Sequence, residues 1–188
     1  MLKLIEEFDT YAEISGFKNV KISQGKEFLD KFSKKKPAAV EAQFFDARRV
    51  AAWQHLYFAA LNALIAFKNG ENISKTLAME TLLYAAAERQ ITKAVELVGI
   101  RATSADVAVI LVGKEPRRME SVLSMISKSI GGQRDEKVLE LSKDKMATIQ
   151  RVFDIRDAEL RTVMEWKDVQ KTLTDLVVER MALLATQR

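Results

Sequence analysis

The amino-acid sequence predicts one layered domain that combines α-helices with β-strands. Its 188 residues, 48% of them hydrophobic, suffice to bury one substantial core and do not require a second domain, so residues 1–188 are expected to form a single unit. The run Ala105–Gly113 is almost continuously aliphatic, which is typical of a strand buried on both faces of a sheet. Other stretches repeat apolar residues every three or four positions, as amphipathic helices do. Taken alone, this alternation of strands and helices favours a parallel sheet.

The first part of the chain predicts a hairpin, a short helix and a further strand. The β-prone runs Leu2–Asp9 and Tyr11–Phe17 are broken at Asp9 and Thr10, as in a hairpin. A helix is predicted over Lys26–Phe32 and is followed by a lysine-rich turn that ends in a proline, which cannot continue a helix. The stretch Ala39–Phe45 is then expected to be extended.

A long helix is predicted from Asp46 to Lys68. Asp46 is a suitable N-cap residue, and Asn69 with Gly70 supplies the stop. The apolar positions that recur at helical spacing, and that we expect to face the core, are Val50, Trp53, Tyr57, Leu61 and Leu64.

The second half predicts a mid-sheet strand at 105–113 and a series of helices. Pro116 begins a helix that ends at Gly131 and Gly132. Its apolar stripe consists of Met119, Val122, Leu123, Ile126 and Ile130. A short strand is predicted at Lys137–Leu141, and Ser142 then caps a helix that carries Met146, Ile149 and Phe153. From about Ala158 the chain is predicted to be helical, with a stripe at Leu173, Val177, Met181 and Leu184.

The stretch Leu82–Ile100 allows two interpretations. Thr81–Ala86 can be a strand that turns into a helix over Gln90–Val98, with Gly99 at its end. Alternatively, Ser74–Val98 can be one uninterrupted helix, because no turn residue stands between them. The local pattern leaves both open.

Composition limits the environment and the partners. The chain has a formal net charge of +4 and a pI near 9.2, which suits an anionic partner, although most of its charge is an ordinary mixed surface. It has no cysteine, no signal-peptide pattern and no apolar run long enough for a bilayer. We therefore expect a soluble, cytoplasmic protein without a membrane partner.

Catalytic motifs are missing where they are easiest to find. The "VGKE" segment after the predicted strand imitates the end of a phosphate-binding loop, but it lacks that loop's first glycine and the hydroxyl residue after the lysine. A single histidine cannot supply a histidine-rich metal site. Adjacent carboxylates such as Asp135 and Glu136 look solvated. We expect no catalysis by the isolated chain and no cofactor or metal.

Two segments carry a resemblance to a known family. "LAMETLLYAAAERQITKAVELVGI" (Leu77–Ile100) and "VLELSKDKMATIQRVFDIR" (Val138–Arg156) together resemble the kinase-associated subunit of the KEOPS (EKC) complex, the TPRKB family, in its archaeal-type forms. The likeness runs in order from about Trp53 to Arg156. It is strongest at Met79-Glu80, Arg89-Gln90-Ile91, Gly99, Gly131-Gly132 and Val138–Leu141.

The resemblance implies a fold. It implies an α+β domain in which a central, largely antiparallel β-sheet is flanked by α-helices, rather than the parallel sheet of the local pattern. It also implies that a strand ends near Ala86 and that Arg89 and Gln90 lie in the turn before a helix.

The resemblance also implies a role. This family's subunit has no active site and binds the small Bud-type kinase/ATPase, which contacts the subunit that transfers threonylcarbamoyl to the adenosine beside the anticodon of ANN-decoding tRNAs. In archaeal-type forms it recruits tRNA through the single-stranded 3′ CCA end. The alternative is a protein-only scaffold or allosteric activator of the kinase that never touches RNA.

Candidate RNA-binding residues fall in three places. Arg89 and Gln90, with Lys93 beyond them, lie where fresh helix N–H groups and an arginine can form an anion site, although Gln90 can also simply cap the helix. Three polar side chains spaced by seven on the long helix suggest one face that meets RNA or packs on another helix; they are Arg48, His55 and Asn62. For His55, a single histidine near a core, a structural, hydrogen-bonded role is favoured over RNA binding. The third set is the lysine run Lys34, Lys35 and Lys36.

Two further features bear on the partners. The family commonly has glycine just before the Arg-Gln turn, where this chain has Ala87 and then Glu88; glycine there permits positive φ, and Glu88 adds an acidic group that would weaken RNA binding. The candidate kinase-binding residues are apolar positions on the terminal helices, namely Leu173, Val177, Met181 and Leu184. They are expected to be exposed for docking; the alternative is that they form a buried stripe.

Overall fold

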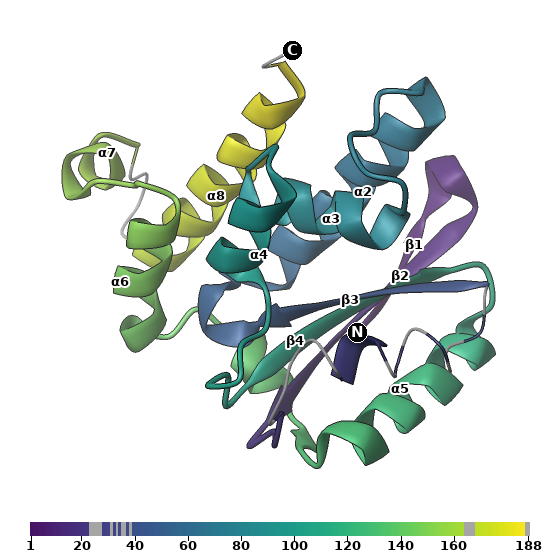
Figure 1. The fold of residues 1–188 in the computed structure, drawn as a ribbon. Helices are drawn as coiled ribbons and strands as arrows, with labels where there is room; N and C mark the ends of the chain where they lie inside the picture. The colour runs from purple at the N-terminus through teal and green to yellow at the C-terminus, as the bar shows by residue number, and fades with distance from the viewer. Residues whose placement is uncertain are drawn as a thin grey trace.

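The fold is a twisted antiparallel sheet between two helical layers (Figure 1). The computed structural model describes residues 1–22, 28–30, 32, 34, 37, 39–163 and 168–186. The strands are β1 (Leu2–Ile5), β2 (Thr10–Lys18), β3 (Val40–Asp46) and β4 (Val107–Gly113), in the order β1-β2-β4-β3, and β5 (Gln133–Arg134) pairs with one end of β2. Each of these pairs is antiparallel. The antiparallel expectation is confirmed, and the parallel sheet of the local pattern is wrong.

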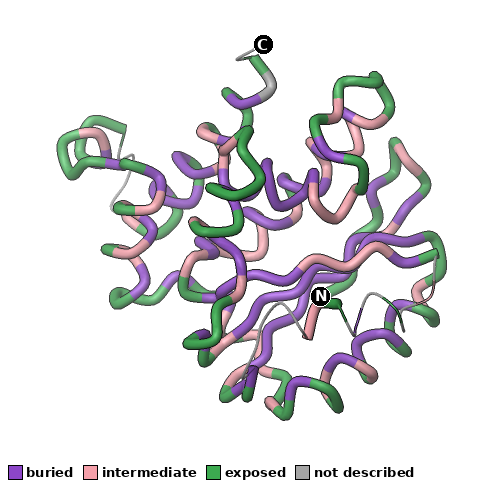
Figure 2. Tube along the Cα trace, in the orientation of Figure 1, coloured by how far each residue is buried: buried purple, intermediate pink, exposed green. Residues whose placement is uncertain are grey.

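Strand β4 lies at the centre of the sheet, as predicted, and all of its residues are buried. Side chains alternate across a strand, so one β4 face carries Ala108, Ile110 and Val112 into a first core. The other face carries Val107, Val109 and Leu111 into a second core. Figure 2 shows buried residues along the middle of the sheet and on the inner sides of the helices.

The two cores are covered by different helices. The first core is covered by α2 (Trp53–Asn69), α3 (Leu77–Ala86), α4 (Ile91–Val98), α6 (Lys143–Val152), α7 (Asp157–Val163) and α8 (Val169–Thr186). The second core is covered by α5 (Pro116–Ile130) and by Phe28, Leu29 and Phe32. Three short 3₁₀ helices complete the described chain: η1 (Glu6–Phe8), η2 (Ala47–Arg49) and η3 (Glu136–Leu139).

Helix α2 begins later than predicted and buries a different face. Asp46 caps the 3₁₀ turn η2, accepting a hydrogen bond from the Arg48 N–H at 3.0 Å, and α2 starts only at Trp53. Its buried face consists of His55, Leu56, Ala59, Ala60, Ala63 and Ala66. Of the predicted core positions, Val50 is buried, whereas Trp53, Tyr57, Leu61 and Leu64 are only partly buried. Alanines occupy most of the inner face of α2, because their small side chains let the helix approach its neighbours closely. Gly70 ends α2 at φ 69°, as predicted.

The stretch Leu82–Ile100 forms two helices, so both the strand and the single long helix are wrong. Helix α3 ends with Ala87 in the left-handed region, at φ 49° and ψ 41°. The Glu88 N–H donates to the Leu83 carbonyl and the Ala87 N–H to the Tyr84 carbonyl, which is the Schellman arrangement. The family glycine that this chain lacks would occupy this conformation without strain.

The segment predicted as a strand at Lys137–Leu141 instead contains the 3₁₀ helix η3. The Glu136 carboxylate accepts hydrogen bonds from the Ser15 hydroxyl at 2.8 Å and from the Gly16 N–H at 3.3 Å, so it is not merely solvated. A Cβ on Gly16 would lie 2.3 Å from Val138 Cγ2. This close approach lets η3 pack directly on β2.

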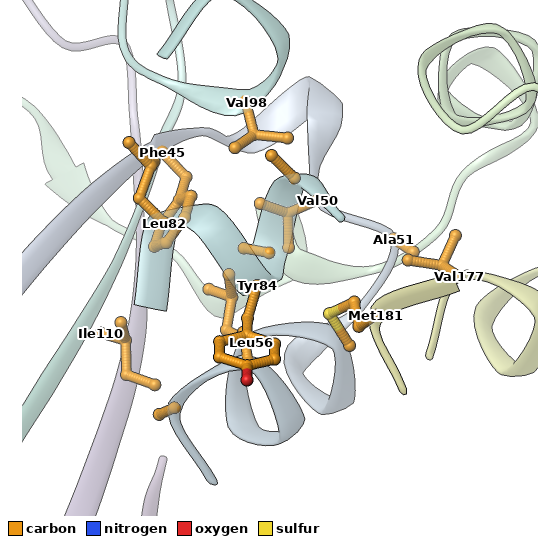
Figure 3. Close-up of a cluster of buried hydrophobic side chains, with 14 of the residues drawn as sticks. Phe45, Val50, Ala51, Leu56, Leu82, Tyr84, Val98, Ile110, Val177 and Met181 are labelled. Atoms are coloured by element: carbon orange, nitrogen blue, oxygen red, sulfur yellow. The ribbon is translucent and has the colours of Figure 1, made fainter. Parts of the chain in front are cut away.

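The remaining helices agree with the predictions, with one correction. The α5 stripe is buried throughout, and Ser142 precedes α6, whose Ile149 is buried with the adjoining Phe153. The α8 stripe at Leu173, Val177, Met181 and Leu184 is buried as well, with at most 4% exposure. Figure 3 shows Val177 and Met181 near Ala51 in the first core. The expectation of an exposed docking face there is wrong, because this chain itself covers it.

Candidate RNA-binding and partner-binding surfaces

The turn between α3 and α4 presents the first candidate residues to solvent. Arg89, Gln90 and Lys93 are exposed. The outer face of α4 adds two apolar side chains, Ile91 and Val95, which are 43% and 42% exposed. Positive groups for phosphates and apolar groups for unstacked bases are what a single-stranded RNA requires. The structure therefore brings basic and apolar side chains together on α4.

The backbone amides of this turn are already occupied. The Glu88 carboxylate accepts hydrogen bonds from the Arg89 N–H at 2.8 Å and the Gln90 N–H at 3.0 Å. Gln90 stands at the N-cap position of α4, yet its side chain makes no capping hydrogen bond. The expectation that Gln90 caps the helix with its side chain is therefore wrong, whereas the anion site at Arg89 stays a prediction.

His55 is a structural residue. It is fully buried, and its Nδ1 accepts a hydrogen bond from the Ala51 N–H at 3.2 Å. Nε2 therefore carries the proton and donates to the Ala85 carbonyl at 2.8 Å. Burial lowers the pKa of His55 to about 4, and the charge of nearby Lys145 acts in the same direction. His55 links the start of α2 to the end of α3 and is not available to RNA.

The predicted face of Arg48, His55 and Asn62 does not exist. Arg48 lies on η2 rather than α2 and is exposed, whereas Asn62 is half-buried two turns beyond His55. A spacing of seven aligns residues only within one continuous helix, and the chain is extended at Val50 and Ala52.

Arg48 instead lines a pocket of about 290 Å³ with three other arginines. The lining consists of Asp46, Arg48, Arg49, Arg101, Thr103, Thr148 and Arg151. We call this the arginine pocket. Asp46 is buried and accepts a hydrogen bond from the Ser104 hydroxyl at 2.9 Å. The pocket lining thus contains four arginines and one carboxylate.

Two of these arginines also hold the end of α4. Arg49 Nη1 donates to the Leu97 carbonyl at 2.6 Å and to the Glu96 carbonyl at 3.2 Å, and Arg101 donates to the same Glu96 carbonyl. Cations at a helix C-terminus stabilise its unpaired carbonyls. Desolvation lowers the pKa of Arg49, and the neighbouring charge of Arg101 lowers it further, while Asp46 opposes them.

Lys34, the described residue of the predicted lysine run, lies away from these residues. Lys34 is exposed and follows Phe28, Leu29 and Phe32, which pack in the second core on the other side of the sheet from α4. Lys35 and Lys36 lie outside the described residues.

A separate pocket of about 910 Å³ opens between the start of α2, the η3 region and α8. We call it the α2–α8 groove. Its apolar lining includes Trp53, Phe58, Leu139, Leu141 and Val178. Phe58 is 36% exposed, and the buried Oε1 of Gln54, also in the lining, has no hydrogen-bond partner in the described part of the chain. The acidic residues of the lining outnumber the one lysine; they are Glu136, Glu140, Asp168 and Asp175.

Within the described residues, no three His, Cys, Asp or Glu side chains gather in a way that could hold a metal ion. None of the helices described is both long enough and apolar enough to span a bilayer.

Comparison with known proteins identifies the family. The family model described as "Kinase binding protein CGI-121" matches residues 17–185. The chain belongs to the CGI-121 family of kinase-binding proteins. The chain is similar in sequence to the "Regulatory protein Cgi121" of Methanocaldococcus jannaschii. The two are 33% identical over 114 residues, which cover 61% of this chain and 70% of the relative. The resemblance seen in the sequence is confirmed.

The CGI-121 match includes every residue of the arginine pocket, and the sequence interpretation missed three of its four arginines, Arg49, Arg101 and Arg151. Arg49 is adjacent to the predicted Arg48, so the pair "RR" in the sequence could have indicated a basic site there. Arg101 and Arg151 lie some fifty and a hundred residues farther along and join the pocket only through tertiary packing.

Proposed function

We propose that this protein is a non-catalytic regulatory subunit that binds the Bud-type kinase/ATPase of the KEOPS complex and docks it in the α2–α8 groove. The support is the partly exposed aromatic side chains of α2, the apolar lining beside them, and the buried Gln54 Oε1, which has no hydrogen-bond partner among the described residues. Aromatic residues are enriched at protein interfaces, and a buried acceptor without a partner is stabilised when a ligand supplies a donor. This groove replaces the α8 stripe as the candidate docking surface.

The test is a charge placed in the groove. Phe58→Arg should weaken binding of the purified kinase about tenfold or more, because truncating or charging an interface anchor typically costs more than 1 kcal/mol. The matched control is Ile73→Arg, since Ile73 is also an exposed apolar residue, at 42% against 36% for Phe58, but does not line the groove. Titration calorimetry gives both affinities. Unchanged binding in Phe58→Arg, or an equal loss in Ile73→Arg, would place the kinase elsewhere.

We further infer that the subunit recruits tRNA by its single-stranded 3′ CCA end. This finer role is supported by the exposed Arg89, Lys93, Ile91 and Val95 on and before α4, and by the basic pI near 9.2. Fluorescence anisotropy at fixed moderate salt should show binding of full-length tRNA that disappears when CCA is removed. Equal or absent binding of both tRNAs favours the second candidate, a protein-only scaffold or allosteric activator of the kinase.

Three charge variants test where the RNA binds. Lys93→Glu should lower tRNA affinity several-fold, whereas Lys128→Glu, on α5 across the sheet, should leave it within about twofold. Glu88→Gln should raise the affinity, because it removes the negative charge held at the α3–α4 turn. Losses of equal size in the two lysine variants would mean that only overall charge matters.

A further inference from the structure

The arginine pocket is an anion site that the family's kinase-binding role does not require. We propose that it binds one phosphate group of the RNA backbone. The proposal rests on the tRNA-binding role inferred above, and it assigns a specific subsite to that role, at the opposite end of α4 from Arg89 and Lys93.

The arginines divide into two pairs with different duties. Arg49 and Arg101 are engaged by the α4 carbonyls of Glu96 and Leu97. Arg48 and Arg151 line the same pocket, and neither has an ion-pair partner among the described residues. The side chains of this second pair are exposed and able to turn toward a ligand.

Among the described residues, the positive charge that lines the pocket exceeds the negative charge. Asp46 is the single carboxylate in the lining, and its two oxygens already accept from the Ser104 hydroxyl and the Arg48 N–H. Guanidinium groups match phosphate oxygens by paired, charge-assisted hydrogen bonds, and the hydroxyls of Thr103 and Thr148 add neutral donors. An anion that enters here relieves repulsion among like charges.

A helix C-terminus ordinarily repels anions, because its carbonyls carry partial negative charge. At α4 this effect is countered by the Arg49 and Arg101 guanidiniums that bind the last carbonyls. The pocket therefore combines neutralised helix-end carbonyls with two further arginines, which no lone helix end provides.

The position favours RNA over a small phosphate. Helix α4 has 8 residues. At 1.5 Å per residue it spans about 12 Å, so a short single strand can reach from the Arg89 turn to the arginine pocket while crossing the exposed Ile91 and Val95. A strand is held by several such phosphate contacts, whereas a free anion would use only one end.

The test removes the two arginines that do not cap α4. Arg48→Gln/Arg151→Gln should lower tRNA affinity about tenfold or more, and should reduce the slope of log affinity against log salt by about 0.7 for the lost single-strand phosphate contact. The control Arg156→Gln/Arg161→Gln removes the same charge from exposed positions outside the pocket and should change neither value by more than about a third. Far-UV circular dichroism and thermal unfolding check that both variants are folded.

Four results would overturn the proposal. Equal losses in the pocket and control variants would mean a general charge effect. Loss of binding in Lys93→Glu together with full binding in Arg48→Gln/Arg151→Gln would uphold tRNA recruitment but reject this subsite. If inorganic pyrophosphate stabilises the wild-type protein and not the pocket variant, without competing with tRNA, the pocket serves a small phosphate instead. No tRNA binding by the wild-type protein would reject the proposed recruiting role itself.

Discussion

His55 is a buried polar side chain whose two ring nitrogens are both used. Nδ1 must stay unprotonated to accept from the Ala51 N–H, so folding favours the neutral ring. The pKa is about 4 in the folded protein and 6.5 in its ordinary state. Above pH 6.5 both states are neutral. As the pH falls toward 4, only the unfolded state gains a proton, so folding stability is lost across this window, by about 3 kcal/mol in all.

Urea unfolding between pH 7.5 and 4 measures this loss. In His55→Gln the part of the pH dependence due to the imidazole should vanish, while stability at pH 7.5 falls by about 1–3 kcal/mol, because at least one buried backbone group loses its partner. An unchanged slope in the variant would show that the acid sensitivity comes from carboxylates instead.

Lys145 predicts a second window, on the alkaline side. It is buried and donates to the Val138 carbonyl at 2.9 Å, and desolvation lowers its pKa to about 8 from 10.5. The unfolded state therefore binds more protons between pH 8 and 10.5, and stability should rise as the pH increases through this range. Lys145→Met should abolish the rise. A fall in wild-type stability between pH 8 and 9.5 would contradict this assignment.

At the scale of elements, the α3–α4 connection is strained at one residue. Ala87 adopts left-handed φ and ψ, which costs an L-residue roughly 1–2 kcal/mol and costs glycine little. Ala87→Gly should therefore raise the free energy of unfolding by about 1 kcal/mol, after allowing for the greater freedom of glycine in the unfolded chain. Denaturant titration measures the gain. Ala86→Gly, one position earlier within α3, is the control and should destabilise.

The same connection shows what local patterns could and could not predict. Helix α5 was predicted closely, because its stripe, its first proline and its final glycine are all local signals. Helix α3 was not, because every residue from Glu80 to Ala86 is buried and the sequence shows no period. The left-handed Ala87 breaks the helix without glycine or proline, so the turn has no sequence signal of its own.

At the scale of the whole molecule, the two cores lie on opposite faces of one sheet, and its central strand β4 supplies side chains to both. Ile110 packs in the first core and Leu111 in the second. Ile110→Ala and Leu111→Ala should each destabilise by about 2–5 kcal/mol, and each should leave one cooperative transition, because neither core is complete without β4. Tryptophan fluorescence and circular dichroism should give coincident curves in both variants. Separate transitions would show that the two helical layers unfold independently.

Long-range assembly is also where residue patterns stop being informative. The antiparallel order of the strands came from family resemblance, since alternating strands and helices pointed to a parallel sheet. The arginine pocket unites side chains from η2, from the segment after α4 and from α6, and no spacing within any one element marks them as partners.

The burial of β4 on both faces has a consequence for sequence variation. Each of its 7 residues is enclosed, so none offers a solvent-facing position at which a polar or larger side chain can be accommodated. In a library of random single substitutions selected for folded protein, few substitutions should be recovered anywhere in Val107–Gly113. On α4 substitutions should be tolerated except at Ala94, Val98 and the partly buried Leu97. Strand β4 therefore limits which substitutions this sequence can accept, whereas the exposed surface of α4 can change and acquire contacts with new partners.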